Sequence, residues 1–135
     1  MNTTTVIGNL TRDPEIRYTR EGQANATFSV AVNRRWQDRT TQEWQEAVSF
    51  FDVVAWGDLA ESIALSLTKG ARVIVVGRFD QRSWENTEGE KRSKVEISAE
   101  DVGPALRFAT VEVHKTGRGE QASVGASDAV GDQPG

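Results

Sequence analysis

Residues 48–77, VSFFDVVAWGDLAESIALSLTKGARVIVVG, decide the fold, because they predict a strand, a short helix and a second strand in succession. In the first strand, Phe51 and Val53 share one face of the pleat, since successive side chains point to opposite sides. That face can build a core. The other face carries Phe50 and Trp56, and a soluble protein rarely exposes large aromatic side chains without a use.

The helix and the second strand continue this division into a packed face and a functional face. Leu59, Ile63 and Leu67 recur every four residues and predict a buried helical stripe. The second strand alternates two sets of side chains, predicted buried and predicted exposed in turn: Val73, Val75 and Phe79, against Arg72, Arg78 and Arg82. The middle of the chain is therefore predicted to be a curved sheet with one face of aromatic and arginine side chains.

Composition narrows the function classes. A chain of 135 residues is long enough for one domain with a single core. It contains no cysteine, which excludes disulfides, thiolate zinc sites and a cysteine nucleophile. Its one histidine, His114, lies outside the predicted core. A single histidine outside the core cannot supply a metal site built from imidazoles, and it makes a Ser-His-Asp triad improbable. We therefore expect no cofactor, no metal and no enzymatic activity.

The sequence shows no membrane segment and no secretion signal. No apolar run approaches the ~20 residues needed to cross a bilayer. The first residues, MNTTTVIGNLTRD, lack the basic start and the apolar block of a signal peptide. These features predict a cytoplasmic protein without a membrane partner.

The rest of the chain adds strands. Residues 24–33 alternate apolar and polar side chains and predict a half-buried strand. A short strand is predicted over residues 4–10, an extended continuation over 15–19 and a further strand over 93–99. With the central unit, this makes five strands with one helix between the third and the fourth. That order is typical of an OB-fold, an all-β five-stranded Greek-key barrel. A β-sandwich is the structural alternative, but sandwiches seldom place a helix there.

Residues 1–105 are therefore predicted to form the OB-fold domain, and two segments follow it. Within residues 106–115, the alternation in RFATVEVH (107–114) predicts one extra C-terminal strand. Residues 116–135 are rich in glycine, serine and alanine, which predicts a disordered tail. Inside the domain, residues 34–46 show no buried-face pattern and predict a long hairpin loop.

The side chains that could carry a function are aromatic and basic. Four aromatic candidates lie on predicted loops or on the outward face: Trp36, Phe50, Trp56 and Trp84. Every base offers a π-face, so such platforms bind single-stranded nucleic acid without sequence preference. Interleaved arginines could pair with phosphates even though the formal net charge is −4: Arg34, Arg35, Arg39, Arg72, Arg78, Arg82 and Arg92.

Other uses of the apolar side chains stay open. Phe50 and Trp56 could instead fill a subunit interface. Trp44, in the same predicted loop as Trp36, is expected to pack onto the barrel wall. Ile74 and Val76 are apolar on the outward face of the fourth strand, which predicts that they lie between the barrels of a tetramer.

Several motifs in order also resemble those of a known family. They are VIGNLTRDPEIRYT, FSVAVNR, TQEWQE, VVAWGDLAES, KGARVIVVGR, QRSWEN and GEKRSKVEI. Over about residues 3–100 the chain resembles the bacterial single-stranded DNA-binding proteins. The resemblance implies stacking platforms at Trp36, Phe50, Trp56 and Trp84, and a homotetramer around which the DNA wraps. The extra strand resembles that of the actinobacterial branch, where such a segment clamps neighbouring subunits.

The chain departs from that family in two respects. Asp52, Asp58 and Asp80 stand where many members have a basic or neutral residue. The stretch VGDQPG at 130–135 lacks the aspartate cluster and apolar tip that recruit repair enzymes in the principal members. We therefore expect a secondary paralogue with few or no partners recruited through the tail. An OB-fold nuclease and a primosome-type adaptor that binds proteins first and DNA second are the alternatives.

Overall fold

The computed structural model describes residues 2–116. Within this range, six strands and one helix follow one another: β1 (Thr4–Leu10), β2 (Glu15–Tyr18), β3 (Ala24–Gln37), β4 (Trp44–Trp56), α1 (Gly57–Ser66), β5 (Arg72–Glu85) and β6 (Lys91–Pro104). The strand order is β1-β5-β6-β4-β3-β2, and β1 also pairs with β3, which closes the sheet into a barrel. β2 follows β1 after a turn and pairs with β3 alone. The predicted five-stranded OB barrel with its single helix is confirmed.

The core follows the alternation of the strands. Its largest fully buried side chains come from β3, β4, β5 and β6: Phe28, Val30, Val53, Val73, Val75 and Ile97. The predicted helical stripe is confirmed, because Ile63 and Leu67 join this core and Leu59 packs against it. Gly57 begins the helix at a φ of 68°, a left-handed conformation that glycine adopts at little cost. The chain therefore passes from β4 into α1 without a loop, which places Trp56 at the end of the strand.

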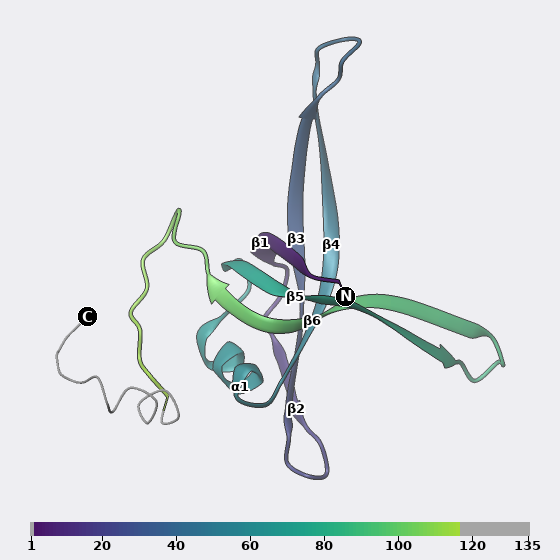
Figure 1. Ribbon diagram of the computed structural model, residues 1–135, viewed down its shortest axis with the longest axis vertical. Coiled ribbons are helices and arrows are strands. Elements are labelled where there is room, and N and C mark those ends of the chain that lie inside the picture. The colour runs from purple at the N-terminus through teal and green to yellow at the C-terminus, as the bar shows by residue number, and fades with distance from the viewer. Residues whose placement is uncertain (1, 117–135) are drawn as a thin grey trace.

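Two long hairpins extend beyond the barrel in different directions (Figure 1). The first, called the β3–β4 arm, is paired out to Gln37 and Trp44, and only the tip between them is a loop. The hairpin loop predicted over residues 34–46 is therefore shorter than predicted, because only residues 38–43 lie outside the two strands. No side chain of the strands is fully buried there, because no core lies beneath either face of the arm.

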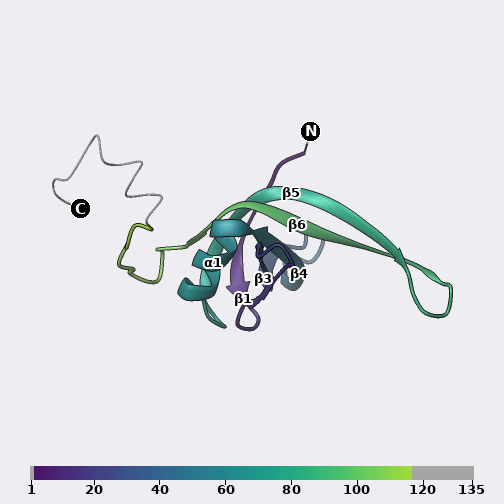
Figure 2. The same cartoon turned by 90° about the horizontal axis from the view of Figure 1, so that it is seen from below.

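The second hairpin, called the β5–β6 arm, curves away from the barrel (Figure 2). Its pairing shifts register between Val76 and Gly77 and then continues to Glu85 and Lys91. Phe79, predicted to be buried, is 42% exposed, because it lies where β5 leaves the barrel. Its ring contacts that of Phe51, with 6.3 Å between centroids, so the pair covers the edge of the core.

The extra strand predicted over residues 107–114 is not formed in the single chain. Residues 105–116 contain no strand, and the sixth strand of the structure is β2. An alternating sequence becomes a strand only beside a hydrogen-bonding partner, and this segment pairs with none of the strands that the structure describes. Phe108 instead lies beneath the guanidinium of Arg72, at 5.3 Å from its ring centroid. The predicted tail lies, beyond Thr116, outside the described residues.

Candidate nucleic-acid interface

An open hollow of about 500 Å³ lies over the outer face of the barrel. It is lined by residues of β2, β3, β4, β5 and β6 and by the turn of the β2–β3 hairpin. Two of the predicted site residues, Trp56 and Arg82, line it together. Trp56 is about half exposed, so its ring presents a free π-face to this hollow.

Cross-strand register explains why these residues meet. In the antiparallel pair of β5 and β6, Arg78 faces Ser98 and Arg82 faces Lys94. In the parallel pair of β4 and β6, Val54 also partners Ser98. Paired residues point to the same side of a sheet. The even-numbered side chains of β4, of β5 from Arg78 onward and of β6 up to Ser98 therefore form one continuous surface, called the outer face below, which includes Phe50 and Trp56.

Acidic side chains accompany the basic ones on the outer face. Nη1 of Arg82 lies 3.3 Å from Oε1 of Glu96, and Nζ of Lys94 lies 3.1 Å from Oδ2 of Asp52. Asp80 lines the hollow beside Glu96. Across residues 2–116, no group of three or more histidine, cysteine, aspartate or glutamate side chains is arranged to hold a metal ion.

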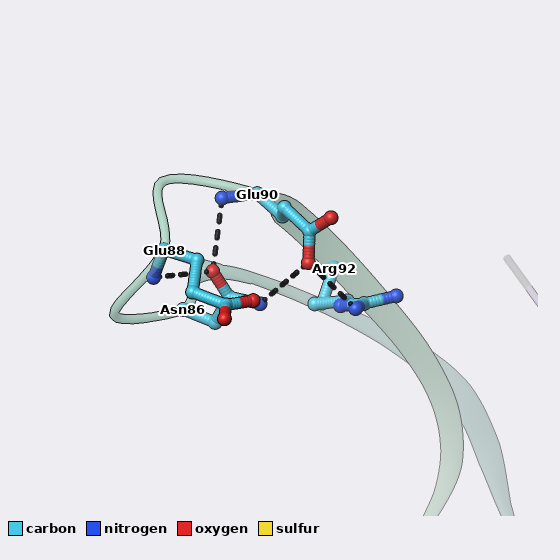
Figure 3. A network of polar contacts seen from close by, with 4 residues as sticks. All are labelled: Asn86, Glu88, Glu90 and Arg92. Carbon is cyan, nitrogen blue, oxygen red and sulfur yellow. Dashed lines mark hydrogen bonds and ion pairs between the residues drawn. The ribbon is translucent and has the colours of Figure 1, made fainter.

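Trp84 lies on the β5–β6 arm, in a second open hollow of about 490 Å³. Its cross-strand partner is Arg92, which lines the same hollow. The turn beyond them is held by polar contacts (Figure 3). Oδ1 of Asn86 accepts hydrogen bonds from the backbone N–H groups of Glu88 and Glu90, both at 2.9 Å, and the Glu90 carboxylate pairs with Arg92 at 2.8 Å. The ion pair with Glu90 ties the guanidinium of Arg92 to this turn.

The β3–β4 arm carries two arginine–tryptophan pairs. The guanidinium of Arg34 lies 5.6 Å from the ring centroid of Trp36, and that of Arg35 lies 5.1 Å from that of Trp44. Residues 34 and 36 share the parity of the core side of β3, whereas residue 44 shares the parity of Phe50 on β4. The structure therefore does not bring Trp36 onto the outer face. Trp44 is 60% exposed, so its predicted packing on the barrel wall is wrong.

The remaining predicted arginines are dispersed. Arg78 is exposed on the outer face, and Arg39 lies in the tip of the β3–β4 arm. At that tip, backbone N–H groups of Thr41 and Thr40 donate to Asp38 and hold the pKa of its carboxyl below its ordinary value. Arg72 lies away from the outer-face hollow, stacked on Phe108.

The sequence reasoning missed three side chains of the outer face and its rim. Tyr18 lines the hollow and is 60% exposed. It ends the short strand β2, which shows no clear alternation, so its direction could be read only from its pairing with Ala24. Lys94 and Glu96 were overlooked because their strand was identified from its apolar residues alone. Both have the parity of Arg92, which would have indicated that they lie on the same face.

Comparison with known proteins gives a consistent result. The single-strand binding protein family matches residues 1–105. The chain is 46% identical to a single-stranded DNA-binding protein of Mycobacterium tuberculosis, over 98% of this chain and 85% of that protein. It is 50% identical to one from Mycolicibacterium smegmatis, over 86% of this chain and 71% of that protein.

A solved structure agrees in fold. The Plasmodium falciparum single-strand binding protein in complex with single-stranded DNA superposes with a TM-score of 0.71 at 28% identity, covering 77% of this chain and 92% of that one. The family match over most of the chain, the identity to actinobacterial relatives and the shared barrel together show that this chain belongs to the single-strand binding protein family.

Proposed function

We propose that this chain binds and coats single-stranded DNA without sequence preference, in DNA replication, recombination or repair. The observation that carries the proposal is that Trp56 and Arg82 share one open hollow on the outer face. Stacking on the indole holds a base, and the guanidinium meets the adjoining phosphate. Members of this family bind DNA and are not enzymes.

The proposed path of the strand follows the outer face of β4. Trp56, Phe50 and Trp44 are spaced six residues apart on one face of this strand, which corresponds to intervals of about 20 Å. Phe50 and Trp44 are largely exposed, and Trp56 is about half exposed. Arg78 and Arg82 supply positive charge along this face, and Arg35 supplies it on the arm. Arg34 lies with Trp36 on the other side of the arm. We add Trp44 and Tyr18 to the site residues predicted from the sequence, and we assign Arg72 no direct contact.

The remaining platforms lie beyond this path. Trp84 extends the surface along the β5–β6 arm. Trp36 faces the other side of the β3–β4 arm, where it would meet a strand that wraps around the arm. DNA that contacts both sides of one arm must bend around it, which supports a wrapped arrangement.

Titration of the chain with oligo(dT), followed by its tryptophan fluorescence, tests this function. Stacking of bases on Trp56 and Trp84 should quench the fluorescence strongly and saturably, and the oligonucleotide should remain intact. Comparison with oligo(dA) and a mixed sequence checks the lack of sequence preference. Quenching by one sequence alone, or no quenching at all, would contradict the proposal. No binding of DNA together with capture of a replication protein would favour the primosome-type adaptor.

We also propose that four copies assemble. Ile7 and Ile74 are cross-strand partners on β1 and β5, and both are exposed apolar side chains. Val76 lies beside them on the same strand face and is partly exposed. A free monomer would leave this apolar patch in water, which favours burial between barrels. Residues 107–114 pair with no strand among residues 2–116, so we propose that they clamp a neighbouring copy.

A chain without residues 106–135 tests the proposed clamp separately from the proposed tetramer. A chain that ends at Ala105 should still sediment as a tetramer, but it should dissociate at a lower denaturant concentration than the full chain. The matched variant Ile74→Asp should dissociate the tetramer outright, because it places a charge within the apolar patch. Equal denaturant resistance of the full and shortened chains would refute the clamp and leave the tetramer standing. A monomeric full chain would refute both.

Two further expectations concern the setting of this activity. Along the whole described range, no helix is long and apolar enough to cross a membrane. We propose that the protein acts where chromosomal DNA lies, in the cytoplasm.

Between residues 116 and 135 the acids Glu120, Asp128 and Asp132 are widely separated, which supports weak recruitment of repair enzymes through this segment.

A further inference from the structure

Three carboxylates lie in a row across the outer face. Asp80 of β5 is the cross-strand partner of Glu96 of β6. Asp52 of β4 stands two residues before Val54, and Glu96 stands two residues before Ser98, the parallel partner of Val54. Asp52, Glu96 and Asp80 therefore follow one another across β4, β6 and β5, and we call them the carboxylate row.

Two members of the carboxylate row already hold the cations that would meet DNA. Arg82 pairs with Glu96 and Lys94 pairs with Asp52, at 3.3 and 3.1 Å. The Arg82 side chain is 66% exposed, whereas that of Glu96 is 8% exposed. The guanidinium thus lies above a nearly buried negative charge. A phosphate that approaches Arg82 from the solvent meets this charge directly behind the cation.

The charge balance of the hollow points the same way. Its lining contains two arginines, Arg17 and Arg82, and two carboxylates, Asp80 and Glu96. These four charges cancel, so the hollow offers a phosphate little net attraction. Like charges within a Debye length of about 8–10 Å repel without full screening by salt.

We propose that the carboxylate row competes with DNA phosphates for Arg82 and Lys94, and so limits both the affinity and the salt dependence of single-stranded DNA binding. This inference rests on the proposed DNA-binding function. Aromatic stacking holds the bases, while the row keeps the phosphate contribution small. A strand held mainly by stacking, with few counterions released, is bound with a shallow salt dependence.

The test is to neutralise the row without changing its shape. Glu96→Gln keeps an oxygen that can accept from Arg82 but removes the charge, and Asp52→Asn does the same for Lys94. Each variant of the full chain should bind oligo(dT) ~3–10-fold more tightly than the wild type at about 50 mM salt. The slope of log affinity against log salt should become more negative by up to ~0.7 for each cation released to a phosphate.

The matched control removes the same charge elsewhere. Glu61 is exposed on α1 and lines neither hollow, so Glu61→Gln should leave the affinity within about twofold of the wild type. Thermal unfolding of each variant shows whether it folds. Should Glu96→Gln fail to fold, Asp52→Asn, at a half-exposed position, decides the question.

Each other outcome counts against the inference. Unchanged affinity in both variants, with a wild type that binds, would overturn it and leave the proposed function intact. Weaker binding would show that Glu96 and Asp52 position the cations for DNA rather than compete for them. A wild type that does not bind oligo(dT) would overturn the proposed function and this inference together.

Discussion

Alanine in place of Gly77 is expected to lower the free energy of unfolding by about 3 kcal/mol. Gly77 lies in β5 at the register shift, where its partner on β6 is Ala99. A Cβ on this residue would overlap the carbonyl oxygen of Ser98 and lie 2.9 Å from its carbonyl carbon and 3.0 Å from the Cα of Ala99. These are backbone atoms, so the contact can be relieved only by opening the β5–β6 ladder. Urea denaturation measures the loss as a lower midpoint at unchanged slope.

Gly103 supplies the matched control. It lies in β6 of the same barrel, and a Cβ there would meet nothing within 4 Å. Gly103→Ala should therefore unfold within about 0.5 kcal/mol of the wild type. Equal midpoints for the two alanine variants would show that the strands do not approach as closely at Gly77 as the structure places them.

Truncation of Trp56 to alanine is expected to weaken oligo(dT) binding by ~10–100-fold, equivalent to ~1–3 kcal/mol for one lost stacking platform. Trp56 lies at the end of β4 in the hollow that Arg82 also lines. The indole is uncharged, so the slope of log affinity against log salt should not change with its removal. Fluorescence anisotropy of a labelled oligo(dT) at several salt concentrations measures both quantities.

Trp56→Phe is the control, because it keeps a π-face at the same position. It should lose far less affinity than Trp56→Ala. If Trp56→Ala binds DNA with wild-type affinity, Trp56 does not contact DNA. It would then be assigned to a contact between subunits, the alternative that the sequence left open. A changed salt slope would mean that the substitution displaces Arg82 as well.

The alternation of side chains was enough to predict the barrel. Phe28, Val30 and Val53 read as core because each strand has water or ligand on one side and apolar side chains on the other. The helix between the third and fourth strands then selected the OB order. These inferences depend on the period of apolar side chains within each strand and on the order of the elements along the chain. Both can be read from the sequence without knowing which distant residues are in contact.

The arms and the C-terminal segment could not be predicted in the same way. Residues 34–37 and 44–46 are strand ends held by pairing, with no fully buried side chain, so their sequence shows no periodic apolar pattern. Phe79 keeps the core parity but lies past the edge of the barrel. Residues 107–114 alternate and still form no strand, because alternation states which faces a strand would have and says nothing about whether a partner is present.

The candidate site was predicted in part. Trp56, Phe50 and Arg82 follow from parity on β4 and β5, and the structure places them on one face. Arg72 shares the parity of Arg82 but lies ten residues earlier, at the start of β5 next to Phe108. The neutralising contacts of Asp52 and Glu96 depend on the pairing of strands distant in sequence, which no pattern within one strand reveals.

The two arms and the barrel differ in local stability. A two-stranded ribbon without a core is only marginally stable by itself, whereas the barrel is closed by pairing on every side. The arms can therefore bend and fray while the barrel stays shut. Compliance of this kind suits a polymer that has no fixed shape, because the arms conform to it as it arrives. Ordering the arms on contact with DNA consumes part of the binding free energy. The bound protein is then easier to displace when another protein must reach the DNA strand.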